Sequence, residues 1–140
     1  MPKLSSVLLV DDDPTSNFLN ERMLKRLDVA DSIIIAENGQ EALAVLHQAN
    51  AGQQLHYPAL ILLDIQMPIM NGIEFLQAYQ QLSPAQQQAT TVIVLTTSTD
   101  TRDLSRLNAL PAAGALNKPL TPEKLDTALQ LHFQRQGARS

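Results

Sequence analysis

The chain has 140 residues, 44% hydrophobic and 17% charged, a composition typical of one folded domain rather than of a disordered segment. Its formal net charge is −4 and it has no run of Lys or Arg, which argues against direct binding to nucleic acid. No apolar stretch approaches the roughly 20 residues that span a bilayer, the first residues lack the apolar core of a signal peptide, and no cysteine is present for disulfides or thiolate metal sites. We therefore expect a single cytoplasmic domain over residues 1–140, with a core of about 6–134, no second domain and no membrane insertion.

Four continuous apolar runs, at residues 7–10, 33–36, 60–63 and 92–95, predict β-strands that are covered by helices on both faces. A weaker fifth run at 114–116 consists mainly of small residues, which favours a strand packed closely by its neighbours. Strands that alternate with helices predict a parallel sheet with right-handed crossovers, and therefore a three-layer α/β sandwich.

Apolar residues at helical spacing predict helices between these runs, beginning near residues 14, 39, 72, 99 and 121. Asp13 before Pro14 is a typical N-cap followed by proline at the first helical position. The helix expected at 99–109 has few apolar residues, so we expect it to be the least firmly held. Segments 49–57 and 83–91 are predicted to be long loops, and the tail after Phe133 to be frayed.

Polar residues follow the ends of four predicted strands. Asp11 and Asp12 follow the first strand, Asp64 the third, Thr96 the fourth and Lys118 the fifth. In an open parallel sheet the site lies beyond the carboxyl ends of the strands, so we expect these side chains to converge. Two unit charges about 4 Å apart repel by roughly 4 kcal/mol at an effective dielectric near 20, so three carboxylates at that spacing require a cation near neutral pH.

Ligands that are all oxygens favour Mg²⁺, Mn²⁺ or Ca²⁺ over zinc, and Mg²⁺ typically combines one or two carboxylates with phosphate oxygens and waters. This pattern indicates an aspartyl-phosphate site. Asp64 would attack phosphorus beside Mg²⁺ held by Asp12 and Asp64, while Lys118 and the Thr96 hydroxyl hold the remaining phosphoryl oxygens. Phosphoryl transfer depends mainly on positioning and electrostatics, so no separate strong base is needed.

Four segments, in this order and at this spacing, resemble the receiver domain of two-component response regulators. They read VDDDP at 10–14, DIQMPIMNG at 64–72, LT at 95–96 and NKP at 117–119. The resemblance covers nearly the whole chain and implies a flavodoxin-like, CheY-like sheet of five parallel strands in the order 2-1-3-4-5.

The resemblance also implies a chemistry for the site. Asp64 would accept a phosphoryl group from a sensor histidine kinase or a histidine phosphotransfer protein, with Thr96 and Lys118 as the other catalytic residues. Mg²⁺ would be bound by Asp12, Asp64 and the Gln66 carbonyl, and by Asp11 through water. The peptide before Pro119 is expected to be cis. Apart from catalysing its own phosphorylation and dephosphorylation, the protein is not expected to be an enzyme.

Without an output domain, the signal is expected to leave by contact with a downstream protein, from a monomer or weak dimer. The face formed by the fourth helix, fifth strand and fifth helix is the expected output surface, with Arg102, Arg106, Asn117 and Lys124. By resemblance alone, the kinase is expected to dock near the first helix, around Thr15, Ser16, Leu19 and Arg22.

The chain departs from the family at two points. Many receivers carry an aromatic switch residue three positions before the lysine, where this chain has Ala115, so we expect signalling with little side-chain gating. The positions that tune the phosphoryl lifetime in the family are Gln66 and Ser98, and both residues could admit a water molecule.

Two other functions fit part of the pattern. Residues 11–15 match the D-x-D-x-T pattern of haloacid-dehalogenase-type phosphatases, in which Asp11 would be the nucleophile and Asp13 the acid/base. That family expects a further acidic pair after the lysine, and only isolated Glu123 and Asp126 follow here. A pseudo-receiver, which signals without phosphorylation, is the second alternative, and the complete acid, hydroxyl and lysine set argues against it.

Overall fold

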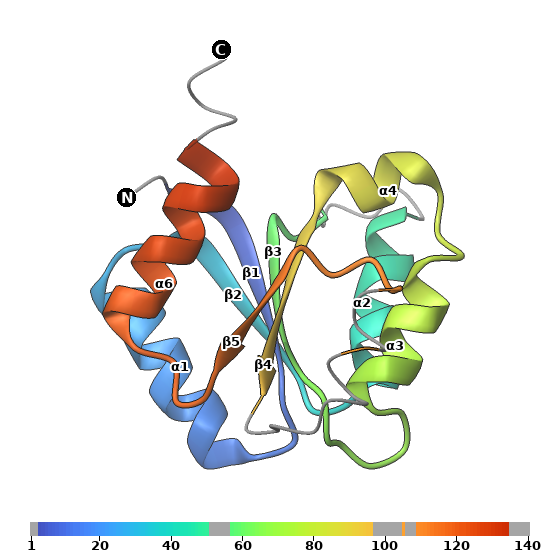
Figure 1. The fold of residues 1–140 in the computed structure, drawn as a ribbon, viewed down its shortest axis with the longest axis horizontal. Helices are drawn as coiled ribbons and strands as arrows, with labels where there is room; N and C mark the ends of the chain where they lie inside the picture. The colour runs from blue at the N-terminus through green and yellow to red at the C-terminus, as the bar shows by residue number, and fades with distance from the viewer. Residues whose placement is uncertain (1–2, 51–56, 97–104, 106–108, 135–140) are drawn as a thin grey trace.

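The computed structural model describes residues 3–50, 57–96, 105 and 109–134 and contains a five-stranded parallel sheet (Figure 1). The sheet order is β2-β1-β3-β4-β5, which confirms the order and fold class expected from the sequence. The strands are β1 (Leu4–Val10), β2 (Ala30–Ala36), β3 (Leu60–Asp64), β4 (Thr91–Thr96) and β5 (Gly114–Asn117).

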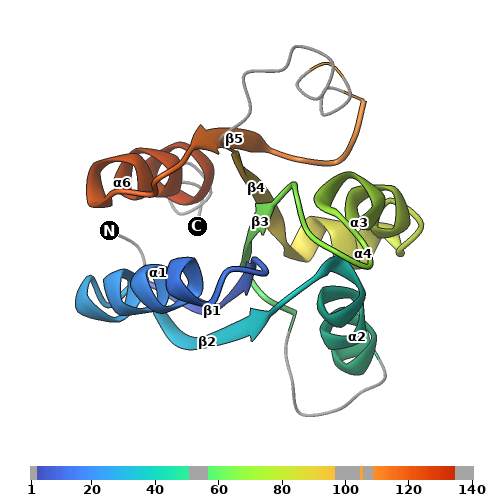
Figure 2. The same ribbon diagram turned by 90° about the horizontal axis from the view of Figure 1, so that it is seen from below.

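Helices cover both faces of the sheet and make it the middle of three layers (Figure 2). The face with α1 (Pro14–Arg26) and α6 (Pro122–Leu129) lies opposite the face with α2 (Gly39–Asn50), α3 (Gly72–Tyr79) and α4 (Pro84–Ala89). Successive strand residues point to opposite faces, so Leu8 packs in the core cluster of α2 and α3 while Leu9 packs in that of α1 and α6.

The central strands β1, β3 and β4 are buried almost throughout, as their continuous apolar runs predict. The expectation that helices cover both faces of every strand is wrong for β2, where Ile35 is 39% exposed. The strand β2 lies at the sheet edge and pairs only with β1, so it has fewer neighbours to cover its side chains.

The segment at 83–91, predicted to be a loop, contains the helix α4, so that prediction is wrong. Ser83 caps this helix, because its hydroxyl accepts from the Gln86 backbone N–H at 3.3 Å while the Gln86 side chain accepts from the Ser83 N–H at 3.2 Å. Pro84 occupies the first helical turn, where its missing N–H costs nothing.

Thr121 caps α6 at the predicted position, and a π-helical turn, η1 (Gln130–Gln134), follows this helix. The helix expected at 99–109, most of the loop at 49–57 and the tail at 135–140 lie outside the described residues. Within the described ranges, no helix is long and apolar enough to cross a membrane.

Candidate functional site

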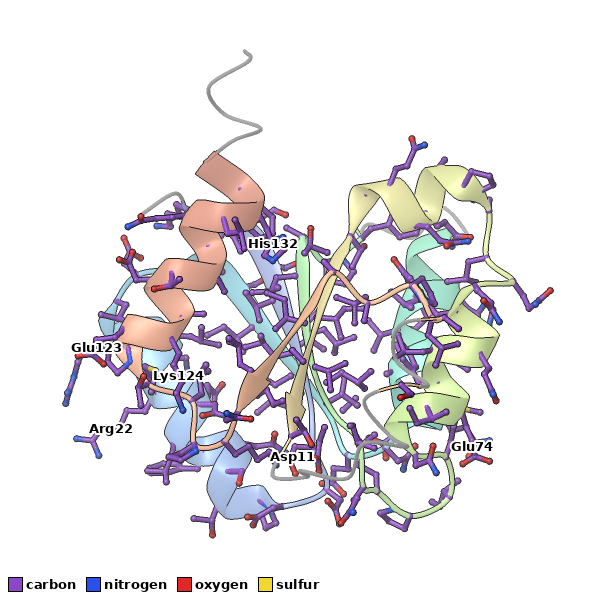
Figure 3. The ribbon with its side chains drawn as sticks, in the orientation of Figure 1. Asp11, Arg22, Glu74, Glu123, Lys124 and His132 are labelled. Atoms are coloured by element: carbon purple, nitrogen blue, oxygen red, sulfur yellow. The ribbon has the colours of Figure 1, made fainter. Side chains whose placement is uncertain are left out.

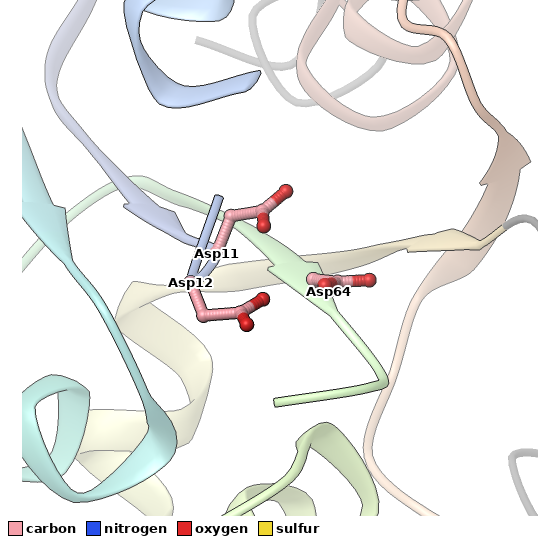
Figure 4. A group of neighbouring side chains, drawn as sticks. All are labelled: Asp11, Asp12 and Asp64. Carbon is pink, nitrogen blue, oxygen red and sulfur yellow. The ribbon is translucent and has the colours of Figure 1, made fainter. Parts of the chain in front are cut away.

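Three carboxylates meet at the carboxyl edge of the sheet (Figure 4). Asp11 and Asp12 follow β1 and Asp64 ends β3, and one oxygen from each lies within 4.8 Å of the others. Asp11 and Asp64 are only 4% and 9% exposed, whereas Asp12 faces solvent. The sequence-based expectation that these acids converge is therefore confirmed.

Lys118 brings the positive charge to this group of acids. Its Nζ donates to Asp11 Oδ2 at 2.8 Å and lies 3.3 Å from Asp64 Oδ1. The residue follows β5, its backbone N–H donates to the Thr96 carbonyl at 2.9 Å, and its peptide bond to Pro119 is cis as expected. Thr96 ends β4 beside Asn117 of β5 and is buried, so it too lies at this edge.

Burial and neighbouring charges both shift the pKa values of Asp64 and Lys118, but they act differently on the two groups. Burial, and then the neighbouring charge of Asp11, raise the pKa of Asp64, although Lys118 opposes the change. Burial alone would lower the pKa of Lys118, but its hydrogen bond to Asp11 and the two carboxylate charges raise it overall. Lys118 is therefore a permanent cation near neutral pH, and a second cation would further stabilise the ionised form of Asp64.

The donor set fits a hard divalent cation, because the three acids offer only carboxylate oxygens. Gln66 lies two residues beyond Asp64 in the exposed loop that leads to α3, and its carbonyl remains a predicted ligand. His132 lies at the far end of the sheet from Asp11 (Figure 3), and His47 is exposed on α2.

The turn between β1 and α1 holds Asp11 in place through two contacts. The Asp13 N–H donates to Asp11 Oδ1 at 2.9 Å, and the buried Asn17 side chain donates to the Asp11 carbonyl at 2.8 Å. The role of Asn17 was not predicted from the sequence. Its position seven residues before buried Leu24, on the inner face of α1, was the signal that could have identified it.

Asp13 has a different role from its two neighbours. Its carboxylate accepts from the Thr15 N–H at 3.0 Å and from the Ser16 hydroxyl at 2.9 Å, which confirms the predicted N-cap of α1. The Ser16 hydrogen bond is the main reason that the pKa of Asp13 lies below its usual value. Both contacts join the Asp13 carboxylate to α1 rather than to the cluster of Asp11, Asp12 and Asp64, called the acid cluster below. This arrangement argues against an acid/base role for Asp13 in a phosphatase.

The loop after Asp64 is fixed to the end of β3 by a close backbone approach at Gly72. Its N–H donates to the Ile65 carbonyl at 2.8 Å, and a Cβ added there would lie 2.5 Å from the Asp64 carbonyl oxygen. Sequence reasoning assigned Gly72 only to the helix start, so this role was also missed. Met67 and Met70 pack against the core cluster of α2 and α3 and so anchor the loop.

The first helix exposes most of the residues expected at the kinase-docking surface. Thr15, Leu19 and Arg22 are exposed and Ser16 is half-buried, and Arg22 points outward from α1 (Figure 3). A groove of about 860 Å³ separates α1 from the segment between β5 and α6, and Lys118 is among the residues that line it. Lys118 therefore contacts the carboxylates of Asp11 and Asp64 and also lines this groove.

The expected output surface is only partly described. Ala115 and Asn117 are exposed on β5, whereas Arg102, Arg106 and the lifetime position Ser98 lie outside the described residues. The Lys124 ammonium donates to the carbonyls of Asn117 and Pro119, both at 3.0 Å, so it holds the β5–α6 connection locally.

The sequence model of the response regulator receiver domain matches residues 7–130, and the chain therefore belongs to this family. The probable chemotaxis protein CheY of Rhizobium etli is 34% identical over 127 residues, which cover 91% of each chain. The transcriptional regulatory protein MalR of Bacillus subtilis is 34% identical over 131 residues, or 94% of this chain and 51% of MalR.

Solved structures agree with this assignment. A two-component response regulator from Cytophaga hutchinsonii is 30% identical with a TM-score of 0.81, and the match covers 93% of this chain and 97% of the other. The phosphorylated cyanobacterial phytochrome response regulator RcpA is 27% identical with a TM-score of 0.71, over 90% and 89% of the two chains. Residues 7–130 of this chain thus form a receiver domain of two-component signalling.

The chain spans only part of several relatives. It covers about half of MalR and 12% of the sensor kinase/phosphatase LuxN of Vibrio harveyi, with which it shares 34% identity over 116 residues. The expectation of a stand-alone domain remains a prediction, because these matches establish the receiver and not what adjoins it.

Proposed function

We propose that this receiver accepts a phosphoryl group on Asp64 in a Mg²⁺-dependent reaction and passes the resulting signal to a protein partner. The observation that supports this proposal most directly is the position of Lys118, whose ammonium contacts both Asp11 and Asp64 at the carboxyl edge of the sheet. A buried carboxylate beside a fixed cation and two further acids is suited to nucleophilic attack on phosphorus.

The proposed reaction forms one bond and breaks another. An Asp64 carboxylate oxygen attacks phosphorus, and the bond between phosphorus and the donor breaks with its electron pair leaving on the donor. Lys118 then neutralises charge on a phosphoryl oxygen, and the Thr96 hydroxyl donates to another. The fixed cation and the short distances supply positioning and electrostatic stabilisation, on which phosphoryl transfer mainly depends.

Asp11, Asp12, Asp64 and the Gln66 carbonyl are the residues that would hold Mg²⁺. When bound, the ion would supply positive charge that reduces repulsion between the carboxylates and the incoming phosphoryl group. Burial and the charge of Asp11 raise the pKa of Asp64, and a nearby cation would favour the ionised form that must act as nucleophile.

The relatives support a signalling role. One similar structure is that of a phosphorylated response regulator, and one relative contains a matching stretch within a sensor kinase/phosphatase. We infer that a sensor histidine kinase or histidine phosphotransfer protein donates the phosphoryl group in the cytoplasm. A downstream protein is then the target, and no enzymatic activity beyond self-catalysed phosphorylation and dephosphorylation is assigned.

Incubation with acetyl phosphate, followed by intact-mass analysis, tests the proposal. A single phosphoryl adduct should form with Mg²⁺, disappear with EDTA and be absent from Asp64→Asn. Asp13→Asn is the matched control, because asparagine is an equally good N-cap and Asp13 lies outside the cluster. That variant should be phosphorylated as the wild type is.

Other outcomes assign other functions. An adduct that survives in Asp64→Asn but is lost in Asp11→Asn would support the phosphatase alternative. No adduct from acetyl phosphate or from a histidine kinase would contradict the proposal and support a pseudo-receiver.

A further inference from the structure

The strand that leads to Lys118 is short and lies at an edge of the described sheet. β5 has four residues and pairs with β4, and Ala115 and Asn117 on it are exposed. The Lys118 ammonium nevertheless reaches the carboxylates of Asp11 and Asp64, which belong to the ends of the inner strands β1 and β3. Short edge segments open locally more readily than central strands. The position of this lysine therefore depends on what holds the chain beside it.

Lys124 holds the chain on both sides of Lys118. Its ammonium donates to the carbonyl of Asn117 and to the carbonyl of Pro119, both at 3.0 Å, and these two residues directly precede and follow Lys118. An ammonium has three donors, and its charge strengthens the hydrogen bonds that it makes. One side chain therefore fixes the backbone before and after the lysine that contacts the acid cluster.

Lys124 is itself firmly placed on α6. It lies at the end of this helix that faces the carboxyl edge of the sheet (Figure 3), and its N–H donates to Thr121 Oγ1 at 3.2 Å. The next residue, Leu125, is completely buried, and Ala128 and Leu129 bury the same helix in the core. The Lys124 side chain thus joins the β5–α6 connection to a well-packed helix.

A lysine at this position opposes the local preferences of the helix. Thr121 is the N-cap of α6, so Lys124 is the third helical residue. A capping box has Glu or Gln there, and the positive end of the helix macrodipole disfavours a cation. The helices α3 and α4 have Glu74 and Gln86 at the equivalent position, and each completes a capping box. A residue that breaks a local rule indicates a compensating role, and the two carbonyl contacts supply one.

We propose that Lys124 is a positioning residue for phosphorylation and acts through Lys118. By fixing the carbonyls of Asn117 and Pro119, it keeps the Lys118 ammonium where it can neutralise a phosphoryl oxygen, and this inference rests on the proposed function of Asp64. The three acids that would hold Mg²⁺ lie at the ends of β1 and β3. Loss of the Lys124 contacts should therefore slow phosphoryl transfer without weakening metal binding.

Three variants separate these contacts from the effect of charge. Lys124→Met removes the ammonium and keeps a long, unbranched side chain, whereas Lys124→Arg keeps a cation with enough donors for both carbonyls. Lys25→Met is the matched control, because it removes one positive charge from the last turn of α1, at the other end of that helix from Asp11. It measures how far the loss of one positive charge alone alters the reaction with an anionic donor.

The second-order rate constant for phosphorylation by acetyl phosphate with Mg²⁺ should be about fivefold lower in Lys124→Met, because small displacements of a positioned group are costly in rate. Lys124→Arg should restore most of the rate, and Lys25→Met should react as the wild type does. Calorimetric titration should give Mg²⁺ dissociation constants within about twofold of one another for all four proteins, as expected if the metal ligands are unmoved.

Amide hydrogen exchange tests whether the change is local. The Lys118 N–H donates to the Thr96 carbonyl at 2.9 Å. Its exchange should be about tenfold faster in Lys124→Met, because the β5–α6 connection then opens more often. The amide of Leu62, in the central strand β3, should exchange as in the wild type.

An unchanged phosphorylation rate in Lys124→Met would overturn this inference while leaving the proposed function intact. An equal loss in Lys25→Met would overturn it too, since net charge would then account for the effect. Weaker Mg²⁺ binding or faster exchange of Leu62 in Lys124→Met would do the same, because they would indicate a general loss of stability. A wild type that forms no adduct would contradict the proposed function and, with it, this inference.

Discussion

The nearly buried carboxylates of Asp11 and Asp64 lie close together, and both contact the ammonium of Lys118. One cation only partly compensates two nearly buried anions and an exposed third, so the arrangement suits binding better than it suits folding. The raised pKa of Asp64 has the same origin, namely burial followed by the charge of Asp11.

Asp64→Asn should therefore stabilise the metal-free protein, by roughly 1 kcal/mol at pH 7. Because the folded-state pKa of Asp64 is raised, its ionisation destabilises the fold as pH rises through that pKa, and this penalty disappears as pH falls through it. Urea denaturation in EDTA at several pH values measures the effect. An Asp64→Asn variant that is less stable than the wild type at pH 7 would contradict this account.

The contribution of Asn17 to the position of Asp11 can also be measured by substitution. Asn17→Ala removes the side chain that donates to the Asp11 carbonyl, which loosens the turn carrying Asp11 and Asp12. Outer contacts to metal ligands typically contribute a factor of about 10–100 to affinity, so calorimetric titration with Mg²⁺ should show about tenfold weaker binding. Asn20→Ala, on the same helix, should bind as the wild type does, and equal affinities for all three proteins would exclude the positioning role.

At the scale of elements, Gly72 allows the start of α3 to lie against the end of β3. Gly72→Ala would place a Cβ 2.5 Å from the Asp64 carbonyl oxygen and 2.8 Å from the Ile65 Cα, and neither backbone atom can move aside easily. We expect a loss of about 2–3 kcal/mol in urea denaturation. Gly114→Ala is the control, because its nearest neighbour, the His132 side chain, would lie at an ordinary 3.5 Å. Similar stabilities for the two variants would contradict the close approach.

The elements also show which sequence signals were sufficient. Four continuous apolar runs and a weaker fifth predicted the five strands. For β1, β3 and β4 the run is continuous because a strand buried on both faces has no polar side to interrupt it. The helix α4 was missed because glutamine-rich composition was given more weight than the Ser83–Gln86 spacing, which matches a capping box. The exposure of β2 depends on its place at the sheet edge, which a single strand's residues do not encode.

At the scale of the whole molecule, the parallel topology brings together residues that are 107 positions apart, as in the pair Asp11 and Lys118. The rule that sites lie beyond the carboxyl ends of strands was enough to predict this convergence. Asn17 and Gly72 could not be predicted from that rule, because their roles depend on a hydrogen bond and a close approach in the folded turns.

Chemical identification of the phosphorylated residue tests the central claim most directly. Borohydride reduces an acyl phosphate to the alcohol, so protein treated with acetyl phosphate and Mg²⁺ and then with borohydride should contain homoserine in place of aspartate. Peptide mass spectrometry is expected to find this conversion at Asp64 alone. Conversion at Asp11, or none at any aspartate in protein that carries a phosphoryl adduct, would contradict the assignment of Asp64 as the phosphoryl acceptor.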